Sequence, residues 1–114
     1  MALGEKSAGL FSNDEQFAND LHQIGQKSLE LNWRLPILSE HRETMKGQHS
    51  DLSNSGKTRY GGASSAAAFL ENFVEKGVKW VHLDIAGPAH SKEGCTGFGV
   101  YTLMDYLKLC EESY

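Results

Sequence analysis

Cysteine, proline and long hydrophobic runs are all scarce in this chain of 114 residues. Its two cysteines, Cys95 and Cys110, are too few for a disulfide framework and lack the spacing of a redox or zinc motif. We therefore expect reduced thiols in a cytoplasmic protein. No apolar run approaches the roughly 20 residues that span a bilayer. Residues 1–12 also lack the apolar core, after a basic start, that marks a secretory signal.

Positive charge is scarce too. With 11 Lys and Arg residues against 15 Asp and Glu residues, the chain carries a net charge of −4 at pH 7. A nucleic-acid binder or a polybasic membrane-surface module needs a basic face, so we expect neither nucleic acid nor membrane as a partner. No internal repeat, low-complexity tract or linker interrupts the sequence, which therefore forms one domain or part of one.

The apolar residues near the start of the chain have helical spacing. Ser12 begins an S-x-x-E motif that has the form of a capping box, and the residues after it predict a helix over 14–31. Gly25 lies inside this range and would weaken the helix by up to ~1 kcal/mol relative to alanine.

Two more helices are expected further along. Apolar spacing predicts a helix over 64–76, with Ser64 as a possible N-cap and Gly77 in the position after the C-cap. The last helix is expected over 101–112, and Cys110 lies on its apolar stripe as a core residue.

Strand-like alternation is clearest over 79–86, where both sets of alternate residues include large side chains. This pattern predicts a buried strand in the middle of an α/β sheet. Pro36 makes 33–38 extended or turn-like, 40–47 is polar enough for one or two helical turns, and 50–62 is a Ser- and Gly-rich loop. The fold class is therefore α/β.

His82 and Asp84 are the most suggestive pair of polar residues, because alternate residues of a strand share a face. They could form part of a metal site, or a catalytic base with the group that orients it. The simpler interpretation is a buried pair that satisfies the backbone or each other. It is favoured because no third ligand has a recognisable spacing.

Two glycine-rich stretches are weaker signals. Residues 55–58 (SGKT) look like the end of a phosphate-binding loop, but Asp51 stands where that motif needs glycine. Residues 94–99 lack the dinucleotide-binding spacing, and nothing near Cys95 argues for a nucleophile. No complete active site is visible from the residues alone.

Several segments, taken in order, resemble the C-terminal portion of the catalytic domain of the leucyl (cytosol) aminopeptidases, a family of two-metal peptidases. The segments at 33–37 and 50–56 resemble the family patterns W-x-L-P-L and A-D-L-x-N-x-G, and the segment at 61–70 resembles G-G-A-I-x-A-A-x-F-L. The complete set is 2–4 (ALG), 33–37 (WRLPI), 50–56 (SDLSNSG), 61–70 (GGASSAAAFL), 80–89 (WVHLDIAGPA) and 96–100 (TGFGV). The resemblance covers essentially residues 1–114, and it implies an incomplete domain with a mixed sheet flanked by helices.

The resemblance also shows what this sequence does not contain. The family signature N-T-D-A-E-G-R-L is absent, as is the segment with the metal-ligand lysine and aspartates. In the complete family enzyme two divalent metal ions, zinc or manganese, polarise the scissile carbonyl and activate water. We therefore expect neither a catalytic nor a metal-ligating residue in this chain, and no activity from the chain alone. Tyr101 stands where the family usually has arginine, and Ser64 stands where an aliphatic residue is common.

The residue roles that the resemblance implies are few. Ala86, Gly87 and Ala89 would form part of the wall that receives the N-terminal side chain of a peptide substrate. Equally, they could be small residues that a tight turn requires. The family is cytoplasmic and forms homo-hexamers. Two hypotheses follow: the chain is part of a metal-dependent aminopeptidase, or it is a non-catalytic binding or assembly module that retains half of the fold.

Overall fold

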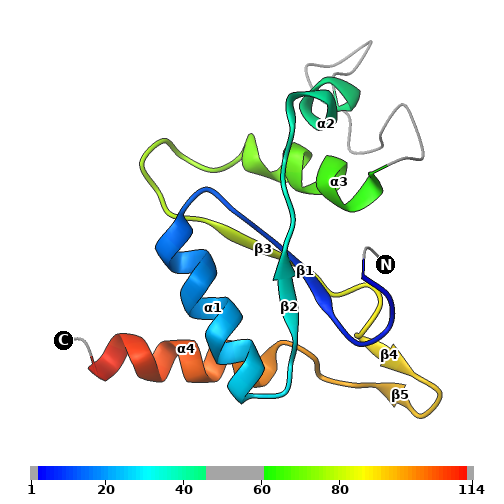
Figure 1. Cartoon of the computed structure of the whole chain (residues 1–114), viewed down its shortest axis with the longest axis vertical. Helices are drawn as coiled ribbons and strands as arrows, with labels where there is room; N and C mark the ends of the chain where they lie inside the picture. Colours follow the sequence, from blue (N-terminus) through cyan, green and yellow to red (C-terminus); the bar gives the residue numbers. More distant parts are fainter. Residues whose placement is uncertain (1–2, 46–60, 113–114) are drawn as a thin grey trace.

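The computed structural model describes residues 3–45 and 61–112, which form a mixed α/β fold (Figure 1). Its main sheet has the order β2-β1-β3, in which β1 is Ala8–Ser12, β2 is Asn32–Arg34 and β3 is Val81–Asp84. The helices are α1 Glu15–Lys27, α2 Ser39–Thr44, α3 Gly62–Glu71 and α4 Val100–Glu112, and a separate hairpin pairs β4 His90–Ser91 with β5 Gly94–Cys95. The predicted class, a mixed sheet flanked by helices, is confirmed.

Strand β1 occupies the centre of the sheet. It pairs in parallel with β2, where Ala8 faces Asn32, and antiparallel with β3, where Leu10 faces Leu83. Ala8, Leu10 and Phe11 are fully buried, as expected of a strand with neighbours on both sides.

The expectation of a central strand over 79–86 was wrong. Strand β3 is shorter, its residues are only half-buried, and in the described part of the chain it pairs with β1 alone. Val81 and Leu83 pack against the core, whereas Ile85 is exposed. Large side chains on both faces indicate partial cover of each face, but they carry no information about which strands lie beside it.

Helix α1 is capped by Asp14, whose Oδ2 accepts a hydrogen bond of 2.8 Å from the Phe17 N–H. The expected cap, Ser12, instead donates its hydroxyl to the Trp80 carbonyl at 2.7 Å and so ties β1 to the chain that enters β3. The helix ends at Lys27, earlier than expected, because Ser28 caps it and Leu29 adopts a left-handed φ of 60°.

Gly25 has a specific role in the path of the chain after α1. A Cβ atom at this position would lie 2.5 Å from the Glu30 carbonyl oxygen and 2.5 Å from Nδ2 of Asn32. The Glu30 N–H also donates to the Gly25 carbonyl at 2.9 Å. Glycine therefore allows the segment that leads into β2 to pass close to the helix, which outweighs its low helix propensity.

Helices α2 and α3 lie together at one end of the sheet (Figure 1). Arg42 and Glu71 form an ion pair between them, with a nitrogen–oxygen distance of 2.5 Å. Helix α3 begins earlier than expected, because Gly61 at a left-handed φ of 60° is its N-cap and Ser64 is buried within the first turn. It also ends earlier, at Glu71, so the left-handed Gly77 belongs to a later turn.

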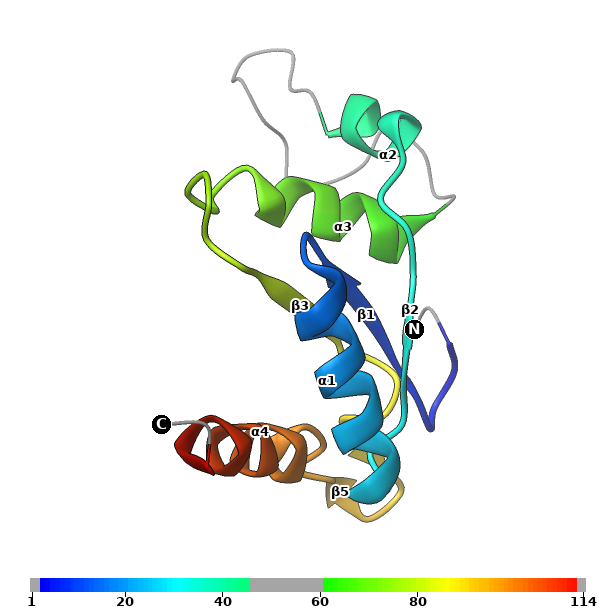
Figure 2. The same ribbon diagram turned by 60° about the vertical axis from the view of Figure 1, so that its left-hand side comes forward.

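Helix α4 packs beside α1 at the other end of the sheet (Figure 2). The rings of Phe17 and Tyr106 stack at 5.1 Å between these helices. The bounds of α4 agree with the expected 101–112 to within one residue. Among the described residues, none of the helices combines the length and apolar character that a membrane crossing requires. The SGKT stretch at 55–58 and most of the expected loop lie outside the described residues.

Candidate functional site

The residues that the resemblance points to lie in one turn between β3 and β4. The Ala89 N–H donates to the Ile85 carbonyl at 2.9 Å, and the Ala86 N–H donates to Oδ1 of Asp84 at 3.1 Å. Ala86 is exposed, while Gly87 and Ala89 are half-buried. The structure therefore gathers the three residues into one compact turn with small side chains and a fixed backbone.

Thr96 holds this turn from the next loop. Its hydroxyl donates to the Pro88 carbonyl at 2.6 Å, and its N–H donates to the Ala89 carbonyl at 3.0 Å. The same hydroxyl accepts a hydrogen bond of 3.2 Å from the Phe98 N–H. Two of the segments that carry the resemblance, 80–89 and 96–100, are thus joined through a single threonine.

After Thr96, the glycine-rich loop binds a side-chain carboxylate of the same chain, that of Glu30. Glu30 is 7% exposed, and its Oε2 accepts from the Gly99 N–H at 2.9 Å. Its Oε1 accepts from both the N–H and the hydroxyl of Thr102, at 2.7 and 2.8 Å. Because these donors form the N-terminus of α4, the carboxylate meets the positive end of the helix dipole.

Sequence reasoning missed Glu30. It lies in the loop between α1 and β2, far along the chain from its partners Gly99 and Thr102. No rule of sequence spacing connects Glu30 with these residues. One signal was available: α4 follows a glycine-rich turn and has no acidic residue in its own first turn. A helix start of this kind favours an acidic partner from elsewhere in the fold.

His82 and Asp84 do not assemble a catalytic or metal site among the described residues. The His82 ring stacks with Phe11 at 5.9 Å and with Trp80 at 6.5 Å, whereas Asp84 accepts from the turn backbone. Burial of the imidazole lowers the pKa of His82 below its ordinary value, and the charge of Asp84 opposes that shift. Over residues 3–45 and 61–112, no three His, Cys, Asp or Glu side chains come together as a metal ion would require.

The two thiols are both free. Cys95 is exposed at the end of the hairpin, and Cys110 is half-buried on α4. The expectation that Cys110 belongs to the core was therefore only partly right. Leu103 and Leu107, which precede it at helical spacing, are exposed.

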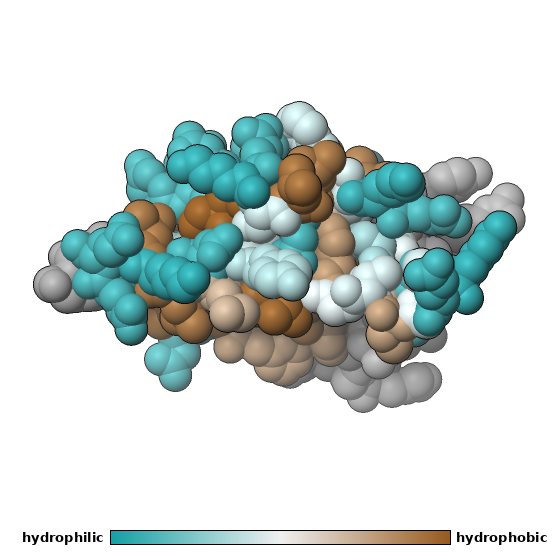
Figure 3. Space-filling view, turned by 90° about the horizontal axis from the view of Figure 1, so that it is seen from below, coloured by the Kyte–Doolittle hydropathy of each residue, from teal (hydrophilic) through white to brown (hydrophobic). Residues whose placement is uncertain are grey.

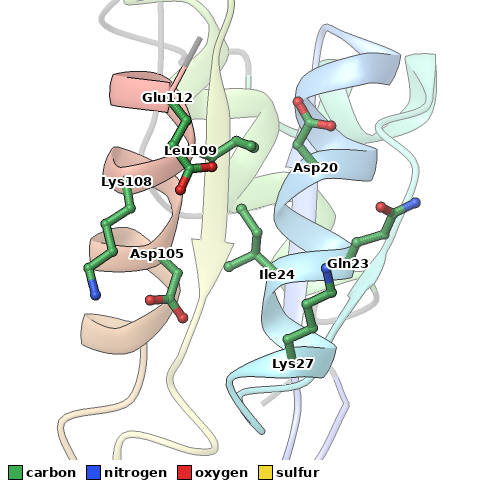
Figure 4. Close-up of a pocket in the computed structure, with 8 residues that line it drawn as sticks. All are labelled: Asp20, Gln23, Ile24, Lys27, Asp105, Lys108, Leu109 and Glu112. Carbon is green, nitrogen blue, oxygen red and sulfur yellow. The ribbon is translucent and has the colours of Figure 1, made fainter.

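A groove lies between α1 and α4, away from this turn (Figure 4). Side chains of mixed charge line it, and Asp105 at its wall accepts a hydrogen bond of 3.1 Å from the Ser28 hydroxyl. The lining residues are Asp20, Gln23, Ile24, Lys27, Asp105, Lys108, Leu109 and Glu112. Ala86, Gly87 and Ala89 are not among them. The balance of carboxylates and ammonium groups gives the groove no clear preference for one charge.

Comparison with known proteins relates this chain to a protein family. Residues 1–104 match the cytosol aminopeptidase family, catalytic domain. The chain is 49% identical over 115 residues to a probable cytosol aminopeptidase of Aquifex aeolicus and 45% identical over 114 residues to one of Persephonella marina. Each alignment covers 94% of this chain and 23% of the relative.

Solved structures agree with the sequence matches. The bottromycin maturation enzyme BotP superposes with a TM-score of 0.90 and 36% identity, over 97% of this chain and 26% of that one. A mutant of tomato leucine aminopeptidase superposes with a TM-score of 0.86 and 39% identity, over 93% of this chain and 21% of that one. BotP in complex with Mn gives a TM-score of 0.89. The chain thus spans about a quarter of the length of the proteins that it matches.

Proposed function

Because the chain belongs to the cytosol aminopeptidase family, we propose that it supplies one part of a metal-dependent aminopeptidase that releases N-terminal amino acids from peptides in the cytoplasm. The match of residues 1–104 to the catalytic domain of the family carries this proposal. Since the chain spans about a quarter of its relatives, the activity would reside in the complete catalytic domain.

In this proposal the turn at 86–89 forms part of the substrate wall. Ala86, Gly87 and Ala89 project little or no side chain, which leaves room for the first side chain of a peptide. The hydrogen bonds from Thr96 support this role, because they fix the backbone of the turn. A rigid wall is what a pocket needs to discriminate between side chains.

The metal chemistry belongs to the rest of the domain. In the complete enzyme two divalent ions, zinc or manganese, would activate the attacking water. The described residues of this chain do not fit such a centre, since none of their carboxylates, imidazoles and thiols gather in threes. We therefore expect the chain alone to be inactive. The homo-oligomeric assembly that the family resemblance implies is likewise proposed for the complete enzyme.

A chimera tests this function. The matched segment of the Aquifex aeolicus relative is replaced by this chain, and manganese-dependent release of leucine from leucyl amide is measured. We expect activity in the chimera and none from the 114-residue chain with manganese added. The unaltered relative is the positive control. A folded but inactive chimera, when the relative is active, would contradict the proposal, as would hydrolysis by the pure chain.

The alternative, a non-catalytic assembly module, has one observation in its favour. Val100, Leu103, Met104 and Leu107 of α4 are exposed apolar residues of the kind found at protein interfaces. An inactive but well-folded chimera would favour this alternative.

A further inference from the structure

The glycine-rich loop between β5 and α4, residues 96–99, has little in its own composition to fix its shape. Gly97 and Gly99 adopt left-handed φ angles of 71° and 100°. Among the described residues, no atom beyond the chain neighbours lies within 4 Å of a Cβ position built at either glycine. The glycines therefore serve the path of the backbone, and such a backbone loses much conformational freedom on folding. The loop keeps one shape only if its two ends are fixed.

Glu30 fixes the end of this loop that leads into α4. Its carboxylate accepts from the Gly99 N–H and from the N–H and hydroxyl of Thr102. Figure 1 shows the connection between α1 and β2, which carries Glu30, beside the start of α4. Figure 3 views the molecule from the side of α4 and shows hydrophilic and hydrophobic side chains intermixed on that surface. Glu30 and Thr102 are not part of the exposed surface, because both are buried.

Thr96 fixes the other end of the loop to the turn at 86–89. Its hydroxyl donates to the carbonyl of the buried Pro88, and its N–H donates to the Ala89 carbonyl. Only two residues separate Thr96 from Gly99, so a shift at one end of the loop reaches the other end. A continuous set of hydrogen bonds and short backbone therefore runs from the Glu30 carboxylate to the turn.

We propose that Glu30 is a positioning residue for the substrate wall. Its carboxylate holds the glycine-rich loop, and the loop holds the turn at 86–89 in the shape that selects the first side chain of a peptide. The inference rests on the proposed function, which places the turn in that wall. Glu30 acts through Gly99, Thr102 and Thr96, and not by contact with the substrate.

A loosened wall has a kinetic effect that a loss of folded protein does not have. The wall contacts the first side chain in the bound substrate and in the transition state alike, so its loss raises KM and leaves kcat unchanged. A glycyl substrate has no first side chain and should be unaffected. A smaller folded fraction would instead lower the rate for every substrate in the same proportion.

The kinetic test uses Glu30→Gln in the chimera described above, with leucyl amide and glycyl amide as substrates. We expect kcat/KM for leucyl amide to fall by about tenfold through KM, whereas the value for glycyl amide stays within about twofold of the parent. Asp14→Ala is the control, because it removes the cap of α1 at the end opposite Glu30 and destabilises the fold. It should leave the ratio between the two substrates unchanged.

Thr102 offers a second pair of variants with a smaller change in the buried cluster. Thr102→Val keeps the shape of the side chain but removes the hydroxyl that donates to Glu30, and Thr102→Ser retains that hydroxyl. The valine variant should shift the substrate ratio in the same direction as Glu30→Gln, and the serine variant should restore it.

Amide hydrogen exchange tests the same link without any activity. In the 114-residue chain, Glu30→Gln and Thr102→Val should speed exchange of the Ala89 N–H, which closes the turn. The internal reference is the Leu35 N–H, which donates to the Leu10 carbonyl in the main sheet. We expect exchange at Ala89 to rise relative to Leu35, because the turn opens locally while the sheet stays closed.

The remaining outcomes overturn the inference. An unchanged substrate ratio in an active Glu30→Gln chimera would overturn it alone, as would an equal loss for both substrates, since Glu30 would then only stabilise the fold. Exchange at Ala89 that rises no more than at Leu35 would show that the carboxylate does not hold the turn. A chimera that is inactive without any substitution overturns the proposed function, and this inference with it.

Discussion

Thr102 binds the carboxylate of Glu30 twice, through its N–H at 2.7 Å and its hydroxyl at 2.8 Å, although the two residues are 72 positions apart in the sequence. The contact joins the loop after α1 to the first turn of α4. Both residues are buried, so neither partner can replace these bonds with water without opening the structure.

Glu30→Gln should destabilise the chain by about 2–3 kcal/mol. The carboxylate accepts from three donors, whereas the amide would present its own NH2 group to at least one of them. Urea unfolding followed by circular dichroism measures the change. Glu93→Gln, at an exposed position of the hairpin turn, is the matched control and should have almost no effect. Equal stability of the two variants would contradict the role assigned to Glu30.

Gly25→Ala should lower the free energy of unfolding by about 1–3 kcal/mol despite the better helix propensity of alanine. The new methyl group would press on the Glu30 carbonyl oxygen and on Nδ2 of Asn32, both 2.5 Å from the Cβ position. Gly62→Ala provides the comparison, because among the described residues no atom beyond its chain neighbours and its own helix backbone lies within 4 Å of its Cβ position. If thermal melts show that both changes stabilise the chain, the close approach at Gly25 does not exist in solution.

Stability should fall as the pH drops below the ordinary His pKa of 6.5, in part through His82. Burial lowers the pKa of His82 in the folded chain, so over the window between the two pKa values the unfolded chain binds the proton more readily. The stabilisation from neutral His82 is complete above the pKa that His82 has in the unfolded chain. It is lost as the pH falls through the lower pKa that His82 has in the folded chain. His82→Phe, which keeps a ring between Phe11 and Trp80, should weaken this dependence. Denaturant midpoints from about pH 8 to about pH 5 measure this pH dependence of stability. Identical profiles for the parent chain and His82→Phe would refute the contribution of His82.

Thr96→Val should loosen the turn at 86–89. The substitution keeps the shape of the side chain but removes the hydroxyl that bonds the Pro88 carbonyl and the Phe98 N–H, at a cost of about 1–2 kcal/mol. Amide hydrogen exchange at Ala89 should become faster, because its N–H bond to Ile85 closes the turn. Thr96→Ser retains the hydroxyl and should exchange like the parent. No difference between the two variants would show that the turn is held by other contacts.

Local patterns in the sequence predicted the local structure well. Apolar spacing indicated α1 and α4, and the ordered motifs at 33–37 and 80–89 indicated the family, which the comparisons confirm. Each of these signals lies within a short window, where periodicity or a motif is sufficient.

Long-range relationships were not predictable from one sequence. Asp14 displaced Ser12 as the cap because Ser12 bonds the distant Trp80 carbonyl, and helix propensity contains no information about such a contact. The burial of β1 depends on which strands flank it, and the partnership of Glu30 with Thr102 depends on the packing of α4. These features are set by tertiary structure, which overrides local preference.

The central position of β1 has a consequence for the order in which the chain folds. Ala8 pairs with Asn32, so β1, α1 and β2 can form a compact parallel unit soon after they are synthesised. The opposite edge of β1 is closed only when Gly9 pairs with Asp84. Contacts between residues so far apart in the sequence form slowly. Until β3 has been synthesised and has paired with β1, one edge of β1 stays exposed. The growing chain is therefore most prone to aggregation during that interval.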